Sequence, residues 1–332
     1  MFIVDAHLDL AYNALHGREV LLPANLQTPG NVAEDGIPSV GLPDLRRGSV
    51  GLVCATIFCE PDNGKGRGYQ TADQAHAEAK RHIDWYHQQF AAGEMKLVRR
   101  AAELPSAPSK EIATIILMEG ADPLRSEEDV KYFFDAGVRI VGLAWKRTRH
   151  AGGTGAPGPL TDEGRRTVRI LDRLGIIHDA SHLAEESFWN LMELTNRPVM
   201  ASHSNCRTFN PTDRQLSDDM IHAIVERGGV IGINFYDKFL VPPEEFRKRK
   251  ANLNDLLRHM KHICEIAGSA AHVAIGTDMD GGFGRDEIPR EIPSAGELPR
   301  LAEFLGNHGF NAQEVAGIMG GNWLRFFSEN LP

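Results

Sequence analysis

Histidine and carboxylate side chains stand at the ends of several short apolar segments of this 332-residue chain. His7 is followed two residues later by Asp9, and residues two apart on a strand point to the same face, so both could reach one cation. Glu119 ends a second apolar segment, and His182 and His203 end two more. Each of these residues alone is commonly a capping or hydrogen-bonded structural group. We interpret them together as one metal site, joined by Asp278 at the end of a further segment.

These apolar segments alternate with amphipathic helical patterns along the chain. The alternation predicts a parallel sheet, and eight repeats favour a closed (β/α)8 TIM barrel over an open sheet, which would leave two edges to protect. Barrel active sites are assembled at the C-terminal ends of the strands. The strands are predicted at residues 2–7, 50–58, 112–119, 139–145, 176–182, 199–203, 229–235 and 272–278.

A single domain is predicted, because no stretch rich in Pro, Gly or Ser separates two parts of the chain. Residues 1–332 would form one barrel, with active-site loops at about 59–70 and 147–160. Both loops follow predicted strands, which places them over the catalytic face. Helix N-caps are predicted at Thr161, Ser217 and Asn311.

Three imidazoles and two carboxylates can hold two divalent ions if one carboxylate bridges them. Glu119 is the natural bridge, and ions about 3.5 to 4 Å apart share a bridging hydroxide. Imidazole with carboxylate favours zinc over calcium or magnesium, although manganese or cobalt could occupy the same ligands. The sequence therefore predicts two Zn²⁺ ions per chain.

Composition excludes several other classes of function. The 45 acidic and 36 basic residues give a net charge of −9, which provides no electrostatic footprint for a nucleic acid or an anionic membrane. No signal-peptide pattern or apolar run of about 20 residues is present, so we predict a cytoplasmic protein. The four cysteines show no C-x-x-C spacing and are expected to be free and mostly buried. Histidines within helical patterns are expected to face solvent, namely His76, His82, His87, His259 and His262.

Four sequence segments together resemble motifs of a known family in order and spacing. They are residues 158–164 (GPLTDEG), 179–182 (DASH), 201–205 (ASHSN) and 228–235 (GGVIGINF). They are similar to motifs of the membrane (renal) dipeptidase family, peptidase family M19, within the amidohydrolase-type metal barrels. The resemblance extends from the first predicted strand to about residue 327.

The resemblance implies the metal ligands that the residues themselves indicate, and it adds two roles. Asp278 is implied to be the catalytic acid/base. Arg214 is implied to bind the free carboxylate of the substrate, a task for which its planar guanidinium is suited. One zinc is implied to be held by His7, Asp9 and Glu119, and the other by Glu119, His182 and His203.

One position departs from the family pattern. After the fourth predicted strand many members carry a His that contacts the substrate carbonyl, whereas Trp145 occupies that position here. His150 could replace it if the loop folds back. The departure affects the predicted substrate more than the predicted reaction.

The predicted function is hydrolysis of the amide bond of dipeptides, or of similar small amides, by a metal-bridging hydroxide. The alternative within the same fold is another binuclear metal amidohydrolase that acts on N-acyl amino acids or lactones. A metal-binding scaffold without turnover is the alternative from a different class, and the complete set of candidate ligands argues against it. A homodimer is expected by analogy alone.

Overall fold

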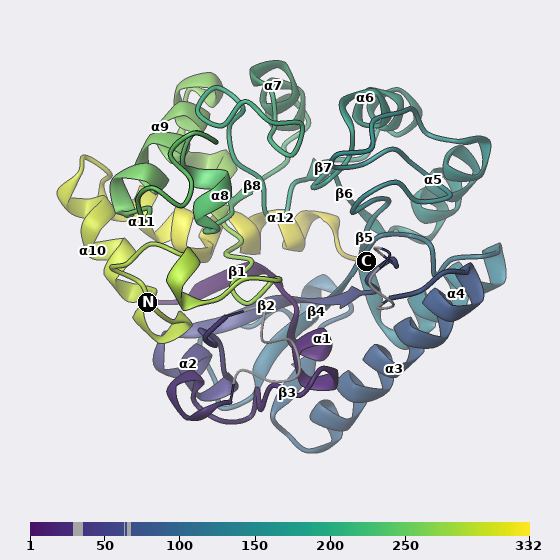
Figure 1. Cartoon of the computed structure of the whole chain (residues 1–332), viewed down its shortest axis with the longest axis horizontal. Coiled ribbons are helices and arrows are strands. Elements are labelled where there is room, and N and C mark those ends of the chain that lie inside the picture. The colour runs from purple at the N-terminus through teal and green to yellow at the C-terminus, as the bar shows by residue number, and fades with distance from the viewer. Residues whose placement is uncertain (29–35, 63, 65–67) are drawn as a thin grey trace.

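Parallel strands alternate with helices in this computed structural model, which describes residues 1–28, 36–62, 64 and 68–332 (Figure 1). Of the predicted loop 59–70, residues 63 and 65–67 lie outside the described residues. Each predicted strand is present, and β3 (Met95–Leu97) is an additional strand that was not predicted. The predicted strands correspond to β1 (Ile3–Leu8), β2 (Val50–Phe58), β4 (Ile112–Glu119), β5 (Val138–Gly142), β6 (Ile177–Asp179), β7 (Val199–Met200), β8 (Ile231–Ile233) and β9 (Val273–Ile275).

Most of the helices surround the strands in chain order, whereas α12 crosses one end of them (Figure 1). The predicted N-caps are confirmed: the side chains of Thr161, Ser217 and Asn311 accept backbone N–H groups in the first turns of their helices. The α-helices are α1 (Leu10–Leu15), α2 (Leu42–Arg47), α3 (Ala72–Ala91), α4 (Glu127–Ala136), α5 (Asp162–Leu174), α6 (Glu185–Leu194), α7 (Asp218–Glu226), α8 (Asp237–Leu240), α9 (Leu253–Ala267), α10 (Pro299–Asn307), α11 (Ala312–Ala316) and α12 (Asn322–Asn330).

The strands form two parallel sheets that together make an incompletely closed barrel. One sheet runs in the order β1-β2-β4-β5-β6-β7, with β3 beside β4, and a second sheet pairs β8 with β9. A single parallel bridge between Ala201 and Ile231 joins the two sheets. Between β9 and β1, the described backbone provides one bond, from Asp278 N to His7 O at 3.2 Å. The predicted parallel (β/α) order is thus confirmed, whereas a continuous closed ladder is not present in the described part of the chain.

The C-terminal segment explains why β9 and β1 do not pair along their length. The turn Gly317–Gly321 contacts both strands. Asn322 then donates a side-chain hydrogen bond to Val273 O at 2.7 Å, and Trp323 Nε1 donates to Ile275 O at 2.9 Å. Side-chain donors of this segment therefore form hydrogen bonds with carbonyl groups of β9.

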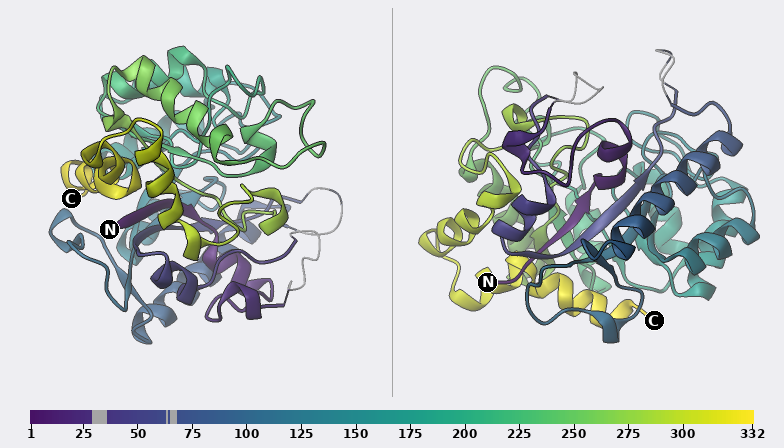
Figure 2. Two further views of the ribbon diagram at one scale, coloured as in Figure 1. Left: turned by 90° about the vertical axis from the view of Figure 1, so that its left-hand side faces the viewer. Right: turned by 90° about the horizontal axis from the view of Figure 1, so that it is seen from below.

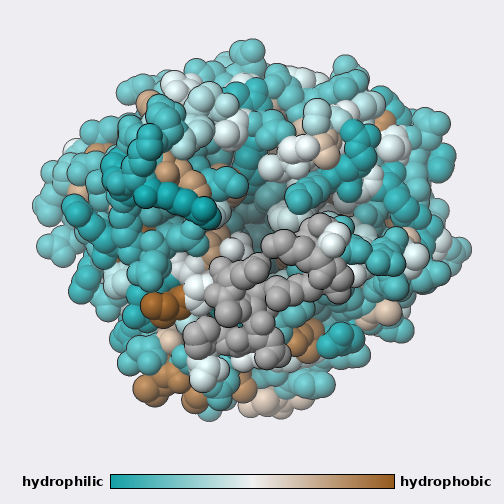
Figure 3. Space-filling view, viewed as in Figure 1, coloured by the Kyte–Doolittle hydropathy of each residue, from teal (hydrophilic) through white to brown (hydrophobic). Residues whose placement is uncertain are grey.

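Helix α12 also closes one end of the barrel interior. Its buried aromatic residues Trp323, Phe326 and Phe327 form one apolar cluster with alternate residues of the strands, such as Val4 and Ala6 of β1. Figure 2 (right) shows α12 below the strands, opposite the loops that follow them. The face seen from the side opposite α12 is mostly hydrophilic and is hollowed near its centre (Figure 3). The C-terminal ends of the strands therefore form the end of the barrel that is open to a ligand.

A buried carboxylate fastens β9 to β1 where the backbone ladder does not. Asp5 is fully buried, and its Oδ1 accepts the backbone N–H groups of Thr277 at 2.8 Å and His7 at 3.3 Å. Its Oδ2 accepts the Thr277 hydroxyl at 2.5 Å. Burial raises the pKa of Asp5 to about 6, although these hydrogen bonds act to lower it. Asp5 thus holds in place the residue that precedes Asp278.

Two of the five helical histidines differ from the sequence-based expectation, whereas His87 is exposed as expected. His82 and His259 are both fully buried rather than facing solvent. His259 Nδ1 accepts the backbone N–H of Cys206 at 3.0 Å, in the connection that follows β7. Burial lowers the pKa of both imidazoles to about 3, so both are neutral at physiological pH. The expectation for the cysteines is confirmed, because all four are free and only Cys264 is partly exposed.

None of the helices in the described ranges combines the length and the apolar character that crossing a lipid bilayer requires.

Replacing Asp5 with Ala should destabilise the protein, because two buried backbone N–H groups and one hydroxyl lose their acceptor. A buried donor without a partner costs about 1–3 kcal/mol, so the free energy of unfolding should fall by at least about 2 kcal/mol. Asp5→Asn retains an acceptor oxygen and should lose less. Urea denaturation measures both values, and an alanine variant as stable as the wild type would show that other contacts hold β9.

The same variants test the pKa of Asp5. Its pKa of about 6 in the folded protein lies above the value of about 3.9 for an unfolded Asp. The folded state therefore binds the proton more tightly, and this contribution to stability is lost as the pH rises from about 4 through 6. The Asn variant should lack this pH-dependent component.

Candidate metal centre

Six titratable side chains from the strand ends meet at the open end of the barrel. His7 lies in β1 and Asp9 directly follows that strand, while Glu119 is the last residue of β4. The other three each lie three residues beyond the end of a strand, namely His182 after β6, His203 after β7 and Asp278 after β9. All six residues are at most 8% exposed. The structure thus brings together every residue that the sequence assigned to the metal ions or to acid/base chemistry.

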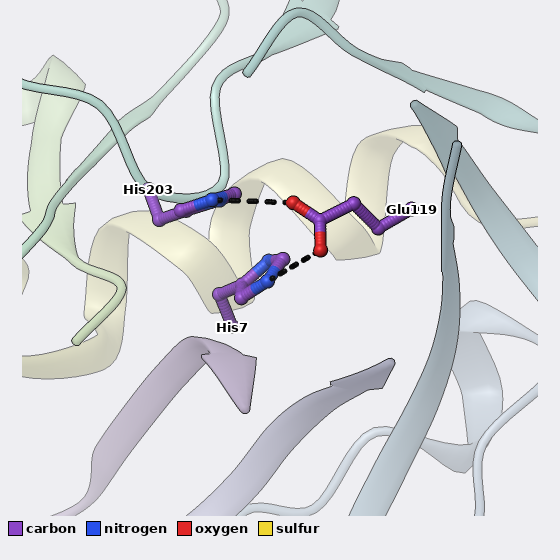
Figure 4. Close-up of side chains that lie close together, drawn as sticks. All are labelled: His7, Glu119 and His203. Atoms are coloured by element: carbon purple, nitrogen blue, oxygen red, sulfur yellow. Dashed lines mark ion pairs between the residues drawn. The ribbon is translucent and has the colours of Figure 1, made fainter. Parts of the chain in front are cut away.

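The carboxylate of Glu119 lies between the imidazoles of His7 and His203 (Figure 4), and His182 approaches it as well. Its Oε2 is 3.6 Å from His7 Nε2. Its Oε1 is 3.2 Å from His182 Nε2 and 3.4 Å from His203 Nε2. One carboxylate therefore presents one oxygen to each side of the cluster, which is the geometry of a bridging ligand.

His7 also faces two further carboxylates. Its Nε2 is 4.0 Å from Asp9 Oδ1 and 4.0 Å from Asp278 Oδ1. Within the described residues, two groups have ligand atoms that lie within 4.8 Å of one another. These groups are His7 with Glu119 and His203, and His7 with Asp9 and Asp278. Asp278 therefore lies close enough to serve either as a metal ligand or as a proton carrier.

The cluster carries an excess of buried negative charge. Burial alone would lower the pKa of His7, but the carboxylates of Glu119, Asp9 and Asp278 raise it to about 10. Burial raises the pKa of Asp278 well above its usual value. Protons thus balance part of the charge that a metal cation would otherwise balance.

The nitrogen atoms of the other two histidines converge on the same point. Burial, together with the positive charge of His7 and Arg214, lowers the pKa of His182 and His203 well below the usual value. Their Nε2 atoms are only 3.0 Å apart. Among the described residues, the buried atoms His7 Nε2 and Glu119 Oε1 have no hydrogen-bond partner. Converging nitrogen and oxygen donors of this kind fit a divalent metal.

Backbone conformation at two of these residues is strained. His182 has φ 67° and Asp278 has φ 58°, a left-handed region that residues other than Gly rarely adopt. Such conformations persist only where the surroundings enforce them, and they are common at functional sites. Asp280, at φ 66°, anchors the turn after β9, because its carboxylate accepts the N–H of Val40 at 3.0 Å and pairs with Arg18 at 2.9 Å.

Neutral side chains orient three members of the cluster. The hydroxyl of Thr56 donates to Asp9 Oδ1. Asn234 Nδ2 donates to Asp278 Oδ2 at 2.8 Å. The third group is the hydroxyl of Thr154, which lies 3.0 Å from His182 Nδ1.

Sequence reasoning did not identify these three supporting groups. Asn234 lies at the end of a predicted strand, so its strand-end position could have indicated it. Thr56 lies within a strand and Thr154 within a loop, where nothing in the sequence distinguishes them from other threonines.

Comparison with known proteins identifies the family of this chain. A model of the membrane dipeptidase family, peptidase family M19, matches residues 1–331. The chain belongs to this family. A protein encoded in the pqqA 5′ region of Klebsiella pneumoniae is 32% identical over 246 residues, 71% of this chain and 89% of its own length. An uncharacterized dipeptidase of Schizosaccharomyces pombe is 26% identical over 343 residues, 98% of this chain and 80% of its own.

Solved structures of M19 proteins share the fold over the whole chain. Dipeptidase AC, a metallopeptidase of family M19, superimposes with a TM-score of 0.82 at 27% identity and covers 100% of this chain and 99% of its own. A metallopeptidase of Rhodobacter sphaeroides, liganded with a phosphinate mimic of L-Ala-D-Ala, gives 0.82 at 26% identity with the same coverage. The chain is therefore a metal-dependent hydrolase of the dipeptidase type.

The three residues predicted to contact the substrate of this M19 protein have different surroundings. Arg214 is buried, donates to His203 O at 2.6 Å, and has an Nε without a hydrogen-bond partner in the described residues. The ring of Trp145 lies 6.2 Å from that of His182. His150 is fully buried, with Nδ1 3.2 Å from the hydroxyl of Thr167 in α5. Arg214 and Trp145 thus lie beside the cluster, whereas the ring of His150 is directed at α5.

Metal binding to this centre should release a proton. His7 has a pKa of about 10 without metal, so it is protonated at pH 7, and a metal that binds Nε2 must displace that proton. Affinity should therefore rise with pH up to about 10. Zinc titration by calorimetry in buffers of different ionisation enthalpy should show about one proton released per chain from this residue.

The matched variant is Glu119→Gln, which removes the carboxylate that raises the pKa of His7 most. It should reduce the proton release together with the affinity. Zinc binding without any proton release in the wild type would contradict the charge state of His7.

Proposed function

We propose that this M19 protein is a zinc-dependent dipeptidase with two zinc ions per chain. His7, Asp9 and Glu119 hold one ion, and Glu119, His182 and His203 hold the other. The observation that carries this proposal is the position of Glu119, whose two carboxylate oxygens face His7 on one side and the other two imidazoles on the other. When bound, the two ions supply a hydroxide at neutral pH and polarise the amide carbonyl.

Asp278 is the residue that moves the proton in this proposal. Its Oδ1 faces the cluster, and its Oδ2 is fixed by Asn234 at 2.8 Å. Burial raises its pKa, so this carboxyl group can take up a proton at a pH where an exposed Asp could not. The proton that Asp278 takes from the attacking hydroxyl would then pass to the amide nitrogen as the C–N bond breaks, and the carboxylate and the amine would leave.

Arg214 restricts the substrate to molecules with a free carboxylate. The positive charge is buried, and its Nη1 and Nη2 already bind Ser204 and the His203 carbonyl, which fixes the guanidinium beside the second ion site. Its buried Nε has no hydrogen-bond partner among the described residues, so the guanidinium has donor capacity left for a carboxylate that enters the centre. Short peptides with a free C-terminus satisfy this requirement, and the Rhodobacter relative was crystallised with a mimic of such a dipeptide.

Trp145 favours a second candidate function, hydrolysis of N-acyl amino acids or lactones by the same metal centre. Its ring lies 5.2 Å from Phe58 as well as near His182, so an aromatic wall stands where many relatives have a His. An apolar wall suits the acyl group of an N-acyl amino acid or the ring of a lactone. Because His150 is directed at Thr167, Trp145 is the stronger candidate of the two for contact with the substrate.

The first test combines metal analysis with substrate screening. Chelator-free protein should contain about two metals per chain and should hydrolyse members of an L,L and L,D dipeptide library, with more turnover after zinc addition. The same dipeptides with an amidated C-terminus are the matched control, and they should react poorly because they lack the carboxylate that Arg214 binds. N-acyl amino acids and lactones complete the panel.

The outcomes separate the candidates. Two metals without dipeptide turnover, but with turnover of acyl amino acids or lactones, would replace the dipeptidase proposal with the second candidate. Failure to bind metal even after zinc addition would contradict the proposed centre itself.

Asp278→Asn should retain zinc and lose about 10²- to 10⁴-fold in turnover, because proton transfer is removed while size and shape are kept. Asn also tolerates the left-handed backbone at this position. Elemental analysis and kcat of the same preparation measure both effects. Loss of zinc in this variant would instead make Asp278 a metal ligand, and unchanged kcat would remove it from the reaction.

A further inference from the structure

The hydroxyl of Ser202 touches both His7 and His203 on the side away from Glu119. Ser202 is fully buried beyond the end of β7. Its Oγ is 2.7 Å from His203 Nδ1 and 3.1 Å from His7 Nδ1. The shortest contact of the same oxygen, at 2.5 Å, is with Asp179 Oδ2 at the end of β6. Three groups, from β1 and from the ends of β6 and β7, therefore meet at one oxygen atom, and the hydroxyl of Ser181 is a more distant fourth neighbour at 3.4 Å.

Ser202 Oγ carries one hydrogen, and this fixes which group is the donor in each of its hydrogen bonds. Asp179 is already an acceptor, because its Oδ1 takes the backbone N–H groups of Ser181 at 3.0 Å and Ser202 at 2.9 Å. The single hydroxyl proton of Ser202 is donated to the nearest acceptor, Asp179 Oδ2. The oxygen then has only lone pairs left for the two imidazoles, so both Nδ1 atoms must carry the hydrogen and donate it.

We propose that Ser202, oriented by Asp179, is a positioning residue that sets the tautomer of two metal ligands at once. With a hydrogen fixed on each Nδ1, both His7 and His203 present an Nε2 lone pair to the centre. This inference rests on the proposed function, in which His7 and His203 serve different ions. One hydroxyl therefore links the two ion sites from outside the ligand shell.

The geometry of the two rings agrees with this role. An imidazole is rigid, so anchoring Nδ1 also directs the opposite Nε2. The rings of His7 and His203 stack with centroids 3.6 Å apart and planes inclined by 30°. Their Nδ1 atoms share Ser202, and their Nε2 atoms approach the two oxygens of Glu119 at 3.6 and 3.4 Å. The two rings thus share Ser202 at their Nδ1 atoms and Glu119 at their Nε2 atoms.

The third imidazole is held separately, which provides an internal contrast. His182 Nδ1 contacts Thr154 from the loop 147–160 and does not share Ser202. Loss of the Thr154 hydroxyl should weaken the binding of only one ion, the one that His182 helps to hold. Loss of the Ser202 hydroxyl should weaken the binding of both ions, because one ligand of each ion loses its hydrogen-bond partner.

The test compares Ser202→Ala with a matched control, Thr195→Val. Thr195 is also buried, and its hydroxyl donates at 2.9 Å to Asp172, a carboxylate that likewise contacts an imidazole, that of His178. This trio lies outside the metal centre. Ser202→Thr, which keeps the hydroxyl, is the rescue variant.

The first readout is zinc affinity by competition with a chromophoric chelator. Ser202→Ala should bind both ions about 10- to 100-fold more weakly, the usual effect of removing a partner of a metal-bound His. Ser202→Thr should restore most of that loss. Thr195→Val should lower the melting temperature and leave zinc affinity at the wild-type value. Equal zinc affinity in Ser202→Ala and wild type would overturn the proposal.

The second readout is long-range ¹H–¹⁵N NMR of the histidines in the zinc-loaded wild type, which needs no variant to fold. Both His7 and His203 should show a hydrogen on Nδ1. A hydrogen on Nε2 of either ring would overturn the proposal. If zinc binding and tautomers are as expected but no dipeptide is hydrolysed, the proposed function fails while the role of Ser202 stands.

Discussion

Repulsion among three buried carboxylates is the constraint on which the rest of the structure depends. Asp9, Glu119 and Asp278 are each less than 8% exposed and surround the single imidazole of His7. In low dielectric such charges cannot remain together without compensation. In the absence of metal the pKa of His7 rises to about 10 and that of Asp278 rises as well, so protons supply part of the compensation. The scaffold maintains an arrangement that is unfavourable by itself and favourable around cations, and metal binding is therefore coupled to the stability of the centre.

A scaffold that enforces such an arrangement must resist relaxation at several points. The backbone at His182 and Asp278 stays in the left-handed region, and Asp280 with Arg18 anchors the turn that carries Asp278. At the opposite end of the barrel, α12 fills the interior with aromatic side chains and satisfies carbonyl groups of β9. The strands are thereby fixed at one end and can present their ligands at the other. Asp5 joins β1 to β9 directly beneath the ligands, and it does so with side-chain rather than backbone hydrogen bonds.

The sequence could predict the strands and the candidate ligands that converge at their ends, because both depend on local patterns. Apolar segments between amphipathic helices define parallel strands, and a parallel sheet places all strand ends on one side, so Glu119 and His203 could be placed together without coordinates. Features that depend on distant contacts could not be predicted. The incomplete β9–β1 ladder results from a segment more than 40 residues further along the chain, where Trp323 binds Ile275 O. The burial of His259 likewise depends on its packing beside Cys206, and a helical period alone does not reveal it. The junction at Ser202 requires β1, β6 and β7 to meet, which no spacing within a motif specifies.

The division between strand ends and loops also separates the reaction from the choice of substrate. Every candidate ligand lies on a strand or within three residues of its end, so the barrel sets the backbone position of each ligand. The groups beside the cluster come from longer connections instead: Trp145 begins the segment that continues into loop 147–160, and Arg214 follows β7 at a greater distance. These two connections touch, because Gly155 N donates to Asp213 Oδ2 at 2.7 Å, next to Arg214. The same loop carries Thr154, which orients His182. A change in this loop can therefore alter the positions of Arg214 and His182 together, whereas the contacts of His7 and His203 with Ser202 lie outside the loop. In the proposed function Trp145 contacts the substrate and is not among the candidate metal ligands, so its replacement should change substrate preference more than the reaction.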